Sequence, residues 1–286
     1  MPTLGQGKLG KHVKSMIFSL SGQGKTFGAG SWPRPNFMDF DGGIGTLTNP
    51  DFVAKYGRRP DIMYDHFFER NKNSRGVPTT ANAFDDSCRY FDACMKAQVT
   101  DWTSYDGTKM KVGRDLFDTW VVDTGTSLSA AAITKAIILL GGSFEGVKSS
   151  TQSSALAHGL VFPKIQDYGS ERSLVEQFIA MLYSTDKNFL FLCHEKEITD
   201  KQGDPIMRVP LLTGKGVEAI SALFDEVWNL QAKREGPGYV RKLQTRPDGI
   251  RSAKSRAGYP DGMLYEYEVI AKEHEKLLNL QKEQGK

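Results

Sequence analysis

The sequence lacks several features that would place it at once in a class of protein. It has only three cysteines, at positions 88, 94 and 193, and their spacing fits neither a disulfide framework nor a metal site. No apolar run reaches membrane-spanning length, and the amino-terminal residues have no signal-peptide core. These absences exclude a disulfide-stapled scaffold and favour a reducing compartment, so we expect a cytoplasmic protein without a membrane partner.

Strong charge and internal repeats are missing too. Lys and Arg number 37 and Asp and Glu 34, so the net charge of +3 is too small to indicate nucleic-acid binding by itself. No repeat of solenoid period is visible. With 286 residues, the chain is long enough for one large α/β domain or two small ones.

One stretch, residues 16–43, has the order of features that triphosphate binding requires. An apolar strand precedes a glycine-rich turn, a short helix that ends before Pro33 and Pro35, and a second strand. The second strand carries carboxylates at Asp39 and Asp41. We place the two strands at residues 16–20 and 36–40.

The turn reads SGQGKT. Its glycines let backbone N–H groups point at phosphate oxygens, Lys25 can reach the outer phosphates, and the Thr26 hydroxyl can bind Mg²⁺. The full pattern has glycine where Ser19 stands, so a strand–turn–helix corner with an accidental Gly-Lys-Thr remains an alternative. We assign nucleotide binding to Ser21, Gly22, Gln23, Gly24, Lys25, Thr26 and Phe27.

Two later apolar strands end in polar residues. The stretch FDTWVVD predicts a buried strand with Asp123 at its carboxyl end, where a nucleotide-bound Mg²⁺ needs a carboxylate; the alternative is a solvated aspartate. His194 ends the second strand, residues 188–194. Its imidazole could sense the γ-phosphate or orient water, and a purely structural histidine is the competing interpretation.

The remaining pattern alternates helices and strands. Apolar residues at helical spacing predict helices over residues 79–99, 128–140, 169–183, 214–230 and 263–281. Further strands are expected at 61–68 and 239–245, a loop or hairpin at 101–115, and a hairpin or flexible loop at 195–212. Glycine and serine make 141–159 look mobile.

Six segments in order resemble the RecA-like P-loop ATPases, most closely the phage single-strand annealing and recombination ATPases of the fourth Sak class. They are SGQGKT, FMDFDGG, DTWVVDTGTSL, FLFLCHEKE, LLTGKGVEAI and AKSRAG. The resemblance implies an α/β fold, a RecA-like P-loop NTPase core over residues 14–258, with a mostly parallel sheet and helices on both faces. Residues 1–13 would be a flexible arm and 259–286 a helical extension.

The resemblance also implies roles for individual residues. Asp41 stands where the family more often has the Glu that activates water, and Asp123 where an Asp assists Mg²⁺. His194, where RecA itself has Gln, would couple the γ-phosphate to a DNA-binding loop. Lys254 and Arg256 match the Lys-x-Arg element of RadA-type and DnaB-type motors, which reaches the γ-phosphate from a neighbouring subunit; a solvated basic turn or a nucleic-acid contact is the alternative.

The expected function is that of an ATP-dependent single-stranded DNA-binding protein that promotes annealing or recombination. Its cofactors would be ATP and Mg²⁺, and its partners single-stranded DNA, further copies in a ring or filament, and a single-strand-binding protein. By the same analogy, residues 141–167 and 195–212 would face DNA, and the compartment would be the host cytoplasm if a phage encodes the chain. A DnaB-like or RadA-like helicase or translocase, or a nucleotide-gated DNA-binding protein with negligible turnover, are the alternatives.

Overall fold

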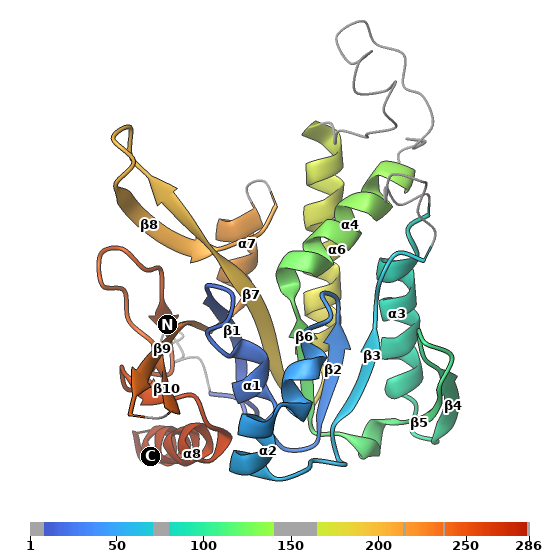
Figure 1. Cartoon of the computed structure of the whole chain (residues 1–286), viewed down its shortest axis with the longest axis horizontal. Coiled ribbons are helices and arrows are strands. Elements are labelled where there is room, and N and C mark those ends of the chain that lie inside the picture. The colour runs from blue at the N-terminus through green and yellow to red at the C-terminus, as the bar shows by residue number, and fades with distance from the viewer. Residues whose placement is uncertain (1–8, 71–79, 140–164, 214–215, 237, 285–286) are drawn as a thin grey trace, which may run out of the picture.

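The computed structural model describes residues 9–70, 80–139, 165–213, 216–236 and 238–284. Its main sheet has the strand order β12-β10-β9-β1-β7-β6-β2-β3 (Figure 1). From β9 to β3 every neighbouring pair is parallel. These parallel strands are β1 (Lys14–Ser19), β2 (Pro35–Asp39), β3 (Met63–His66), β6 (Thr119–Asp123), β7 (Asn188–Thr199) and β9 (Glu226–Glu235).

Antiparallel strands extend this parallel centre. On the far side of β9 lie β10 (Gly238–Gln244), then β12 (Met263–Leu264), and the short β11 (Lys254–Ser255) also pairs with β9. The outer part of β7 forms a hairpin with β8 (Pro205–Pro210), which projects from the sheet in Figure 1. A separate hairpin joins β4 (Thr100–Thr103) to β5 (Lys109–Val112).

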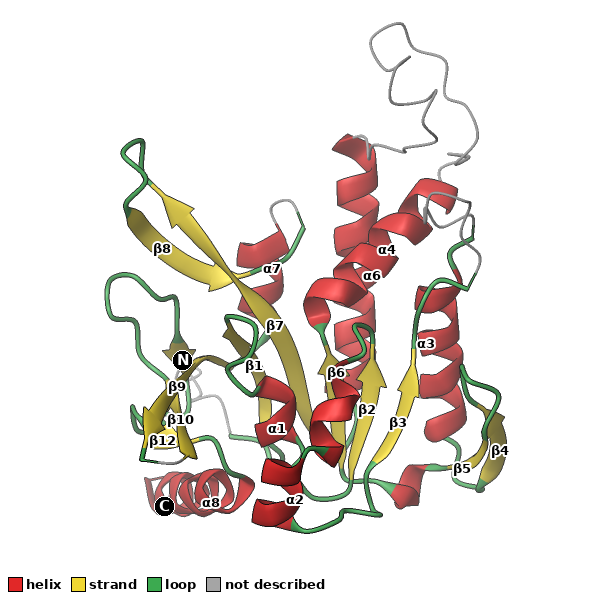
Figure 2. Ribbon diagram, in the orientation of Figure 1, coloured by secondary structure: helices red, strands yellow, loops and turns green. Residues whose placement is uncertain are grey.

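Helices cover both faces of the sheet (Figure 2). Alternate strand residues belong to two different apolar clusters: in β1, Met16 and Phe18 pack with one and Ile17 with the other. The first cluster includes residues of α3 (Asn82–Cys94), α4 (Gly125–Leu139), α6 (Ile165–Tyr183) and α7 (Gly216–Leu223). The second includes residues of α1 (Lys25–Ala29), α2 (Pro50–Tyr56) and α8 (Tyr267–Gln284).

This architecture is the α/β fold that the sequence predicts, with a mostly parallel sheet and helices on both faces. Because β1, β2, β6 and β7 are parallel, the polar residues that end them gather at one edge of the sheet. The register pairs Ser19 with His194 and Asp39 with Asp123. The hairpins at 101–115 and 195–212 are also confirmed.

One predicted helix is wrong in its second half. α7 ends at Leu223, and residues 226–235 form β9 instead of continuing the helix to residue 230. Val227 fits the helical spacing of the preceding apolar residues, but Val227, Trp228 and Leu230 are buried in a strand beside β1. Pairing with a central strand therefore outweighs the local periodicity.

Other boundaries shift by part of an element. α3 is shorter than the expected helix at 79–99, α6 begins earlier, at Ile165, and α8 begins only at Tyr267. The expected mobile segment at 141–159 lies outside the described residues. No helix in the described ranges is both long and apolar enough to cross a membrane.

The described part of the amino-terminal segment packs on the carboxyl-terminal helix. The Leu9 backbone N–H donates to Gln281 Oε1 at 2.8 Å, and His274 Nε2 lies 3.0 Å from the Gly10 carbonyl oxygen. Val13 is buried in the cluster beneath α8. The division into an arm (1–13), a core (14–258) and an extension (259–286) stays a prediction.

Candidate functional site

The turn between β1 and α1 is shaped by glycine and tied to the sheet. Gly22 and Gly24 have φ of 78° and 89°, the left-handed region that glycine adopts without strain. The Gln23 side chain does not face outward: its Oε1 accepts the Ala232 backbone N–H at 2.8 Å, which fixes the turn to β9. Ser21 at the start of the turn is exposed.

Lys25 is almost completely buried beneath this turn, with 6% of its surface exposed. Its Nζ donates to the carbonyl oxygens of Ser19 (3.1 Å) and Leu20 (3.2 Å), and the Ser19 hydroxyl lies 3.3 Å away. Burial lowers the pKa of the Lys25 amine, and Asp123 opposes this shift. Hydrogen bonds from a buried ammonium to charged oxygens are stronger than those to neutral acceptors, so phosphate oxygens would replace these carbonyl partners favourably.

The departure from the consensus at Ser19 therefore has a structural account. Ser19 is fully buried at the end of β1, where its hydroxyl lies beside the Lys25 amine instead of obstructing the turn. The hydroxyl also donates to the Leu20 carbonyl oxygen at 3.1 Å. A small polar residue at this position thus supports the lysine.

Thr26 and Asp123 meet across the sheet edge. Thr26 Oγ1 donates to Asp123 Oδ2 at 2.6 Å, and Asp123 is 1% exposed. Burial raises the pKa of the Asp123 carboxyl to about 7; the Thr26 hydroxyl opposes this shift, and the neighbouring Asp41 and Asp39 carboxylates add to it. A nearby cation would favour the ionised carboxylate.

Gly43, the first residue of the 3₁₀ helix η1 (Gly43–Thr48) that follows β2, leaves room for such a cation. A Cβ placed on Gly43 would lie 3.2 Å from Asp123 Oδ2, 3.2 Å from Asp41 Oδ1 and 3.3 Å from Thr26 Oγ1. Two carboxylates and one hydroxyl therefore surround a space that any other residue would fill. Hard oxygen donors of this kind fit Mg²⁺, which binds proteins through one or two carboxylates and takes its remaining ligands from phosphates and water. In the described ranges, no group of three or more His, Cys, Asp and Glu side chains offers an all-protein site.

We expect Gly43→Ala to weaken Mg²⁺-dependent ATP binding about tenfold, because the added methyl group occupies the space between the three oxygens. Gly45→Ala is the matched control, since a Cβ there meets nothing within 4 Å and Gly45 lies in the same 3₁₀ helix. Titration of Mg²⁺ into the protein with ATP present measures the effect. Equal affinities in the two variants would show that this space holds no metal.

Asp41 and His194 face one another at the same edge. His194 Nε2 lies 3.4 Å from Asp41 Oδ2, and both side chains are about one quarter exposed, at 29% and 26%. The His194 backbone N–H donates to Thr126 Oγ1 at 3.0 Å, which holds the end of the inner part of β7. The structure thus brings Asp41, His194, Lys25, Thr26 and Asp123 together, as the sequence predicts.

A second carboxylate–histidine pair lies behind Asp41 and was not predicted. Asp39 is fully buried, and its Oδ1 accepts backbone N–H groups of residues 41, 42 and 43 at 3.2, 2.8 and 3.2 Å. Its Oδ2 lies 2.8 Å from His66 Nδ1 at the end of β3. This pair fixes the turn that carries Asp41 and Gly43. The spacing Asp39-x-Asp41 is visible in the sequence, but the partner His66 is not.

Lys254 and Arg256 do not join this group. β11 pairs Lys254 with Val227 and Ser255 with Glu226, and Glu226 is in register with Ser15 near the amino end of β1. Four strand residues, about 13 Å, separate that level from Ser19. The Arg256 guanidinium therefore lies at the opposite edge of the sheet from Lys25 in the same chain.

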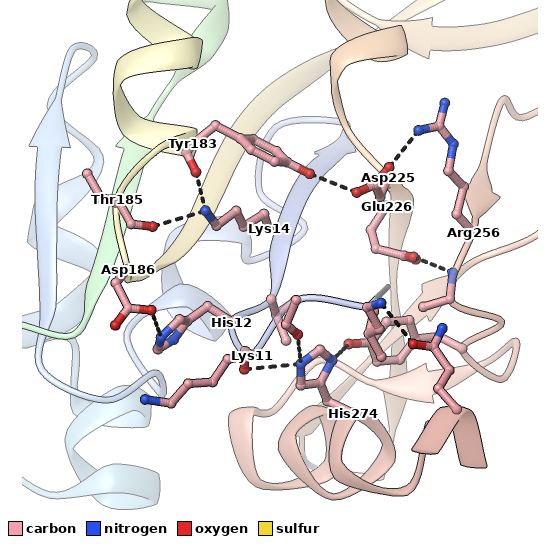
Figure 3. A pocket seen from close by; sticks show the side chains of 16 residues that line it. Lys11, His12, Lys14, Tyr183, Thr185, Asp186, Asp225, Glu226, Arg256 and His274 are labelled. Carbon is pink, nitrogen blue, oxygen red and sulfur yellow. Dashed lines mark hydrogen bonds and ion pairs between the residues drawn. The ribbon is translucent and has the colours of Figure 1, made fainter. Parts of the chain in front are cut away.

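At that opposite edge Arg256 borders a cavity of about 530 Å³ (Figure 3). Its Nη1 donates to Asp225 Oδ1 at 2.6 Å, and Tyr183 donates to the other oxygen of the same carboxylate at 3.1 Å. Lys14 Nζ reaches the carbonyl oxygens of Tyr183 and Thr185 across the cavity wall. The side chains of Arg256 and Asp225 are exposed at 62% and 51%, so water screens their ion pair.

The expected DNA-facing segments are only partly described. Most of residues 141–167 lies outside the described residues. In the β7–β8 hairpin Lys196 and Lys201 are exposed, whereas Arg208 is held by Glu197 at 2.7 Å. Ile198, Ile206 and Met207 are exposed on the same hairpin. The hairpin therefore presents a mixed surface.

Comparisons with solved structures give only distant likenesses. The crystal structure of the RadB recombinase aligns over 88% of this chain and 84% of its own, at 10% identity and a TM-score of 0.39. That of the KaiC-like protein PH0186 from the hyperthermophilic archaeon Pyrococcus horikoshii OT3 aligns over 85% and 82%, at 12% identity and a TM-score of 0.38.

The comparison of sequences gives a clearer result. No curated protein matches the chain. A family model described as an AAA domain, however, matches residues 11–257, which include β1, the glycine turn, every residue around Gly43, and β11. The chain therefore belongs to the AAA domain family.

Proposed function

We propose that the protein is an ATPase that binds ATP in the turn between β1 and α1 and hydrolyses it with Mg²⁺. The observation that carries the proposal is the convergence of Thr26, Asp123 and Asp41 around the space beside Gly43, next to the turn that covers the buried Lys25 amine. A buried lysine amine, a hydroxyl and a carboxylate at the carboxyl ends of parallel strands match what a metal-bound triphosphate requires. Ser21, Gly22, Gln23, Gly24 and Phe27 would contribute backbone N–H groups to the phosphates.

In this proposal each side chain at the sheet edge has one task. Lys25 binds the outer phosphates, and Thr26 with Asp123 holds the metal. Asp41 accepts a proton from the water whose oxygen attacks the γ-phosphorus, while the bond to the β–γ bridging oxygen breaks to give ADP and phosphate. His194, 3.4 Å from Asp41, orients the Asp41 carboxylate or that water. When bound, Mg²⁺ neutralises charge on the phosphate oxygens.

Lys254 and Arg256 would complete the site of a neighbouring copy. Their place at the opposite edge of the sheet is out of reach of Lys25 in the same chain, which supports action across a subunit boundary. A head-to-tail contact of this kind produces a ring or a filament. ATP would then be hydrolysed only in the assembled protein.

We further propose that nucleotide controls binding of single-stranded DNA, as in the phage annealing and recombination ATPases that the sequence resembles. His194 ends the inner part of β7 and is followed directly by the projecting β7–β8 hairpin. A change at the γ-phosphate could therefore move an element with exposed lysines at 196 and 201. A single-strand-binding protein would be a further partner by the same analogy.

The test is single-stranded DNA binding measured without nucleotide, with ADP and with a non-hydrolysable ATP analogue, alongside steady-state ATPase activity. We expect the ATP analogue to strengthen DNA binding and DNA to stimulate hydrolysis. ATP binding without DNA stimulation or turnover would instead favour a nucleotide-gated DNA-binding protein. The structural reason for this alternative is that Asp41 has a shorter side chain than Glu and lies 3.4 Å from His194. DNA affinity that is equal in all three states would refute nucleotide control.

A further inference from the structure

Arg241 of β10 lies against the glycine turn, although its sequence position is remote from that turn. Its guanidinium carbon is 3.9 Å from the centre of the Phe27 ring. A Cβ on Gly24 would come within 2.1 Å of Arg241 Nε, so the arginine occupies the space that this glycine leaves open. The register that places it there pairs Arg241 with Ala232, whose N–H is held by Gln23.

The hydrogen-bonding of Arg241 is incomplete. Its Nε is buried and has no hydrogen-bond acceptor among the described residues. Burial lowers the pKa of the Arg241 guanidinium, and the Coulombic influence of Tyr56 and Asp51 only opposes that shift. A buried donor without an acceptor costs free energy, so the position of Arg241 is set by its packing on Phe27 and the glycine turn and not by a hydrogen bond of Nε.

The ring beneath Arg241 is not itself available to a ligand. Phe27 is 6% exposed and packs in an aromatic group with Phe52 and Tyr56, at centroid distances of 5.3 and 5.7 Å. The planar guanidinium covers this group, as arginine does when it stacks on an aromatic face. One face of the guanidinium is thus occupied by Phe27, and Arg241 as a whole is only half-buried.

We propose that Arg241 is a base-binding residue: the nucleobase of the bound nucleotide stacks on the face of the guanidinium that is turned away from Phe27. This inference rests on the proposed nucleotide site and specifies how that site distinguishes a nucleotide from bare phosphate. A guanidinium held flat between two π systems tolerates different bases, because every base has a π face. Arg241 also ties the base to the β9–β10 hairpin.

The experiment compares binding of ATP and of inorganic tripolyphosphate by calorimetry in the full-length protein. For Arg241→Ala we expect ATP to bind about tenfold more weakly and tripolyphosphate to bind as in the unmodified chain, since only the base contact is lost. Arg241→Lys keeps the charge without the planar group, so it should resemble Arg241→Ala. Arg234→Ala is the matched control, because it removes an exposed cation from the same hairpin.

Each of the following five results would overturn the inference. Equal losses for ATP and tripolyphosphate would mean that Arg241 contacts phosphate, and full affinity in Arg241→Lys would mean that charge alone matters. Unchanged ATP binding in Arg241→Ala would mean that the arginine takes no part. If the unmodified chain binds tripolyphosphate as tightly as it binds ATP, the proposed base contact is refuted but the proposed phosphate site is not. If it binds neither, the proposed function fails as well.

Discussion

A Lys25→Ala chain is expected to bind ATP about a hundredfold more weakly or worse while remaining folded. The amine is buried under the turn, and a phosphate that replaces its carbonyl partners would form charge-assisted hydrogen bonds, worth about 1.5–3 kcal/mol each. The methyl side chain forms none of these bonds. Because the buried ammonium itself carries a desolvation penalty, its removal should cost the free protein little stability.

Lys272→Ala is the control for this comparison, since Lys272 is exposed on α8. Equilibrium binding of a fluorescent ATP analogue measures the affinity, and thermal unfolding without nucleotide checks the fold. If Lys25→Ala binds ATP within threefold of the Lys272→Ala chain, nucleotide does not bind at this turn.

Arg256→Ala is expected to lower ATP hydrolysis about a thousandfold and to leave ATP binding unchanged. A cation that stabilises the transferring phosphoryl group acts on turnover, and such arginines are worth about 10³ or more in kcat. In its own chain Arg256 lies at the amino ends of the strands beside Asp225, where it cannot touch a triphosphate held by Lys25. Arg251→Ala, in the same basic stretch, should hydrolyse ATP normally.

Mixing the two defective chains separates action across a boundary from action within one chain. An interface between an Arg256→Ala copy and a Lys25→Ala copy can combine an intact turn from the first with an intact Arg256 from the second. We therefore expect the mixture to recover a measurable fraction of the unmodified turnover, whereas each variant alone has almost none. Failure to recover any activity, or full activity of Arg256→Ala alone, would refute the proposed role in a neighbouring subunit.

Local sequence was sufficient for the parts of the site that follow one another along the chain. Each strand that ends in a functional residue is a short apolar run, and the glycine turn is contiguous with β1. Asp123 and His194 could be placed beside Lys25 because parallel strands bring their carboxyl ends to one edge. The departure at Ser19 needed the structure, which shows its hydroxyl beside the lysine amine.

The residues that were missed are brought in by pairing between distant segments. His66 reaches Asp39 only because β3 pairs with β2, and Arg241 reaches Gly24 only because the β9–β10 register places it there. Gly43 matters because it has no side chain to fill the space beside it. The oxygens around that space come from α1, from β6 and from the segment after β2. The helix predicted over residues 224–230 is wrong for the same reason. These residues form a strand because they pair with β1, which is distant in the sequence, and helical spacing does not reveal that pairing.

The most direct measurement is a crystal structure with Mn²⁺ and a non-hydrolysable ATP analogue, in which anomalous scattering locates the metal. We expect the metal beside Gly43, bound by Thr26 Oγ1 at about 2.0–2.2 Å with Asp123 close by, and the outer phosphates on the Lys25 amine. A nucleotide found in the cavity beside Arg256 and His274 at the amino ends of the strands, with the turn at Lys25 empty, would contradict the proposed site.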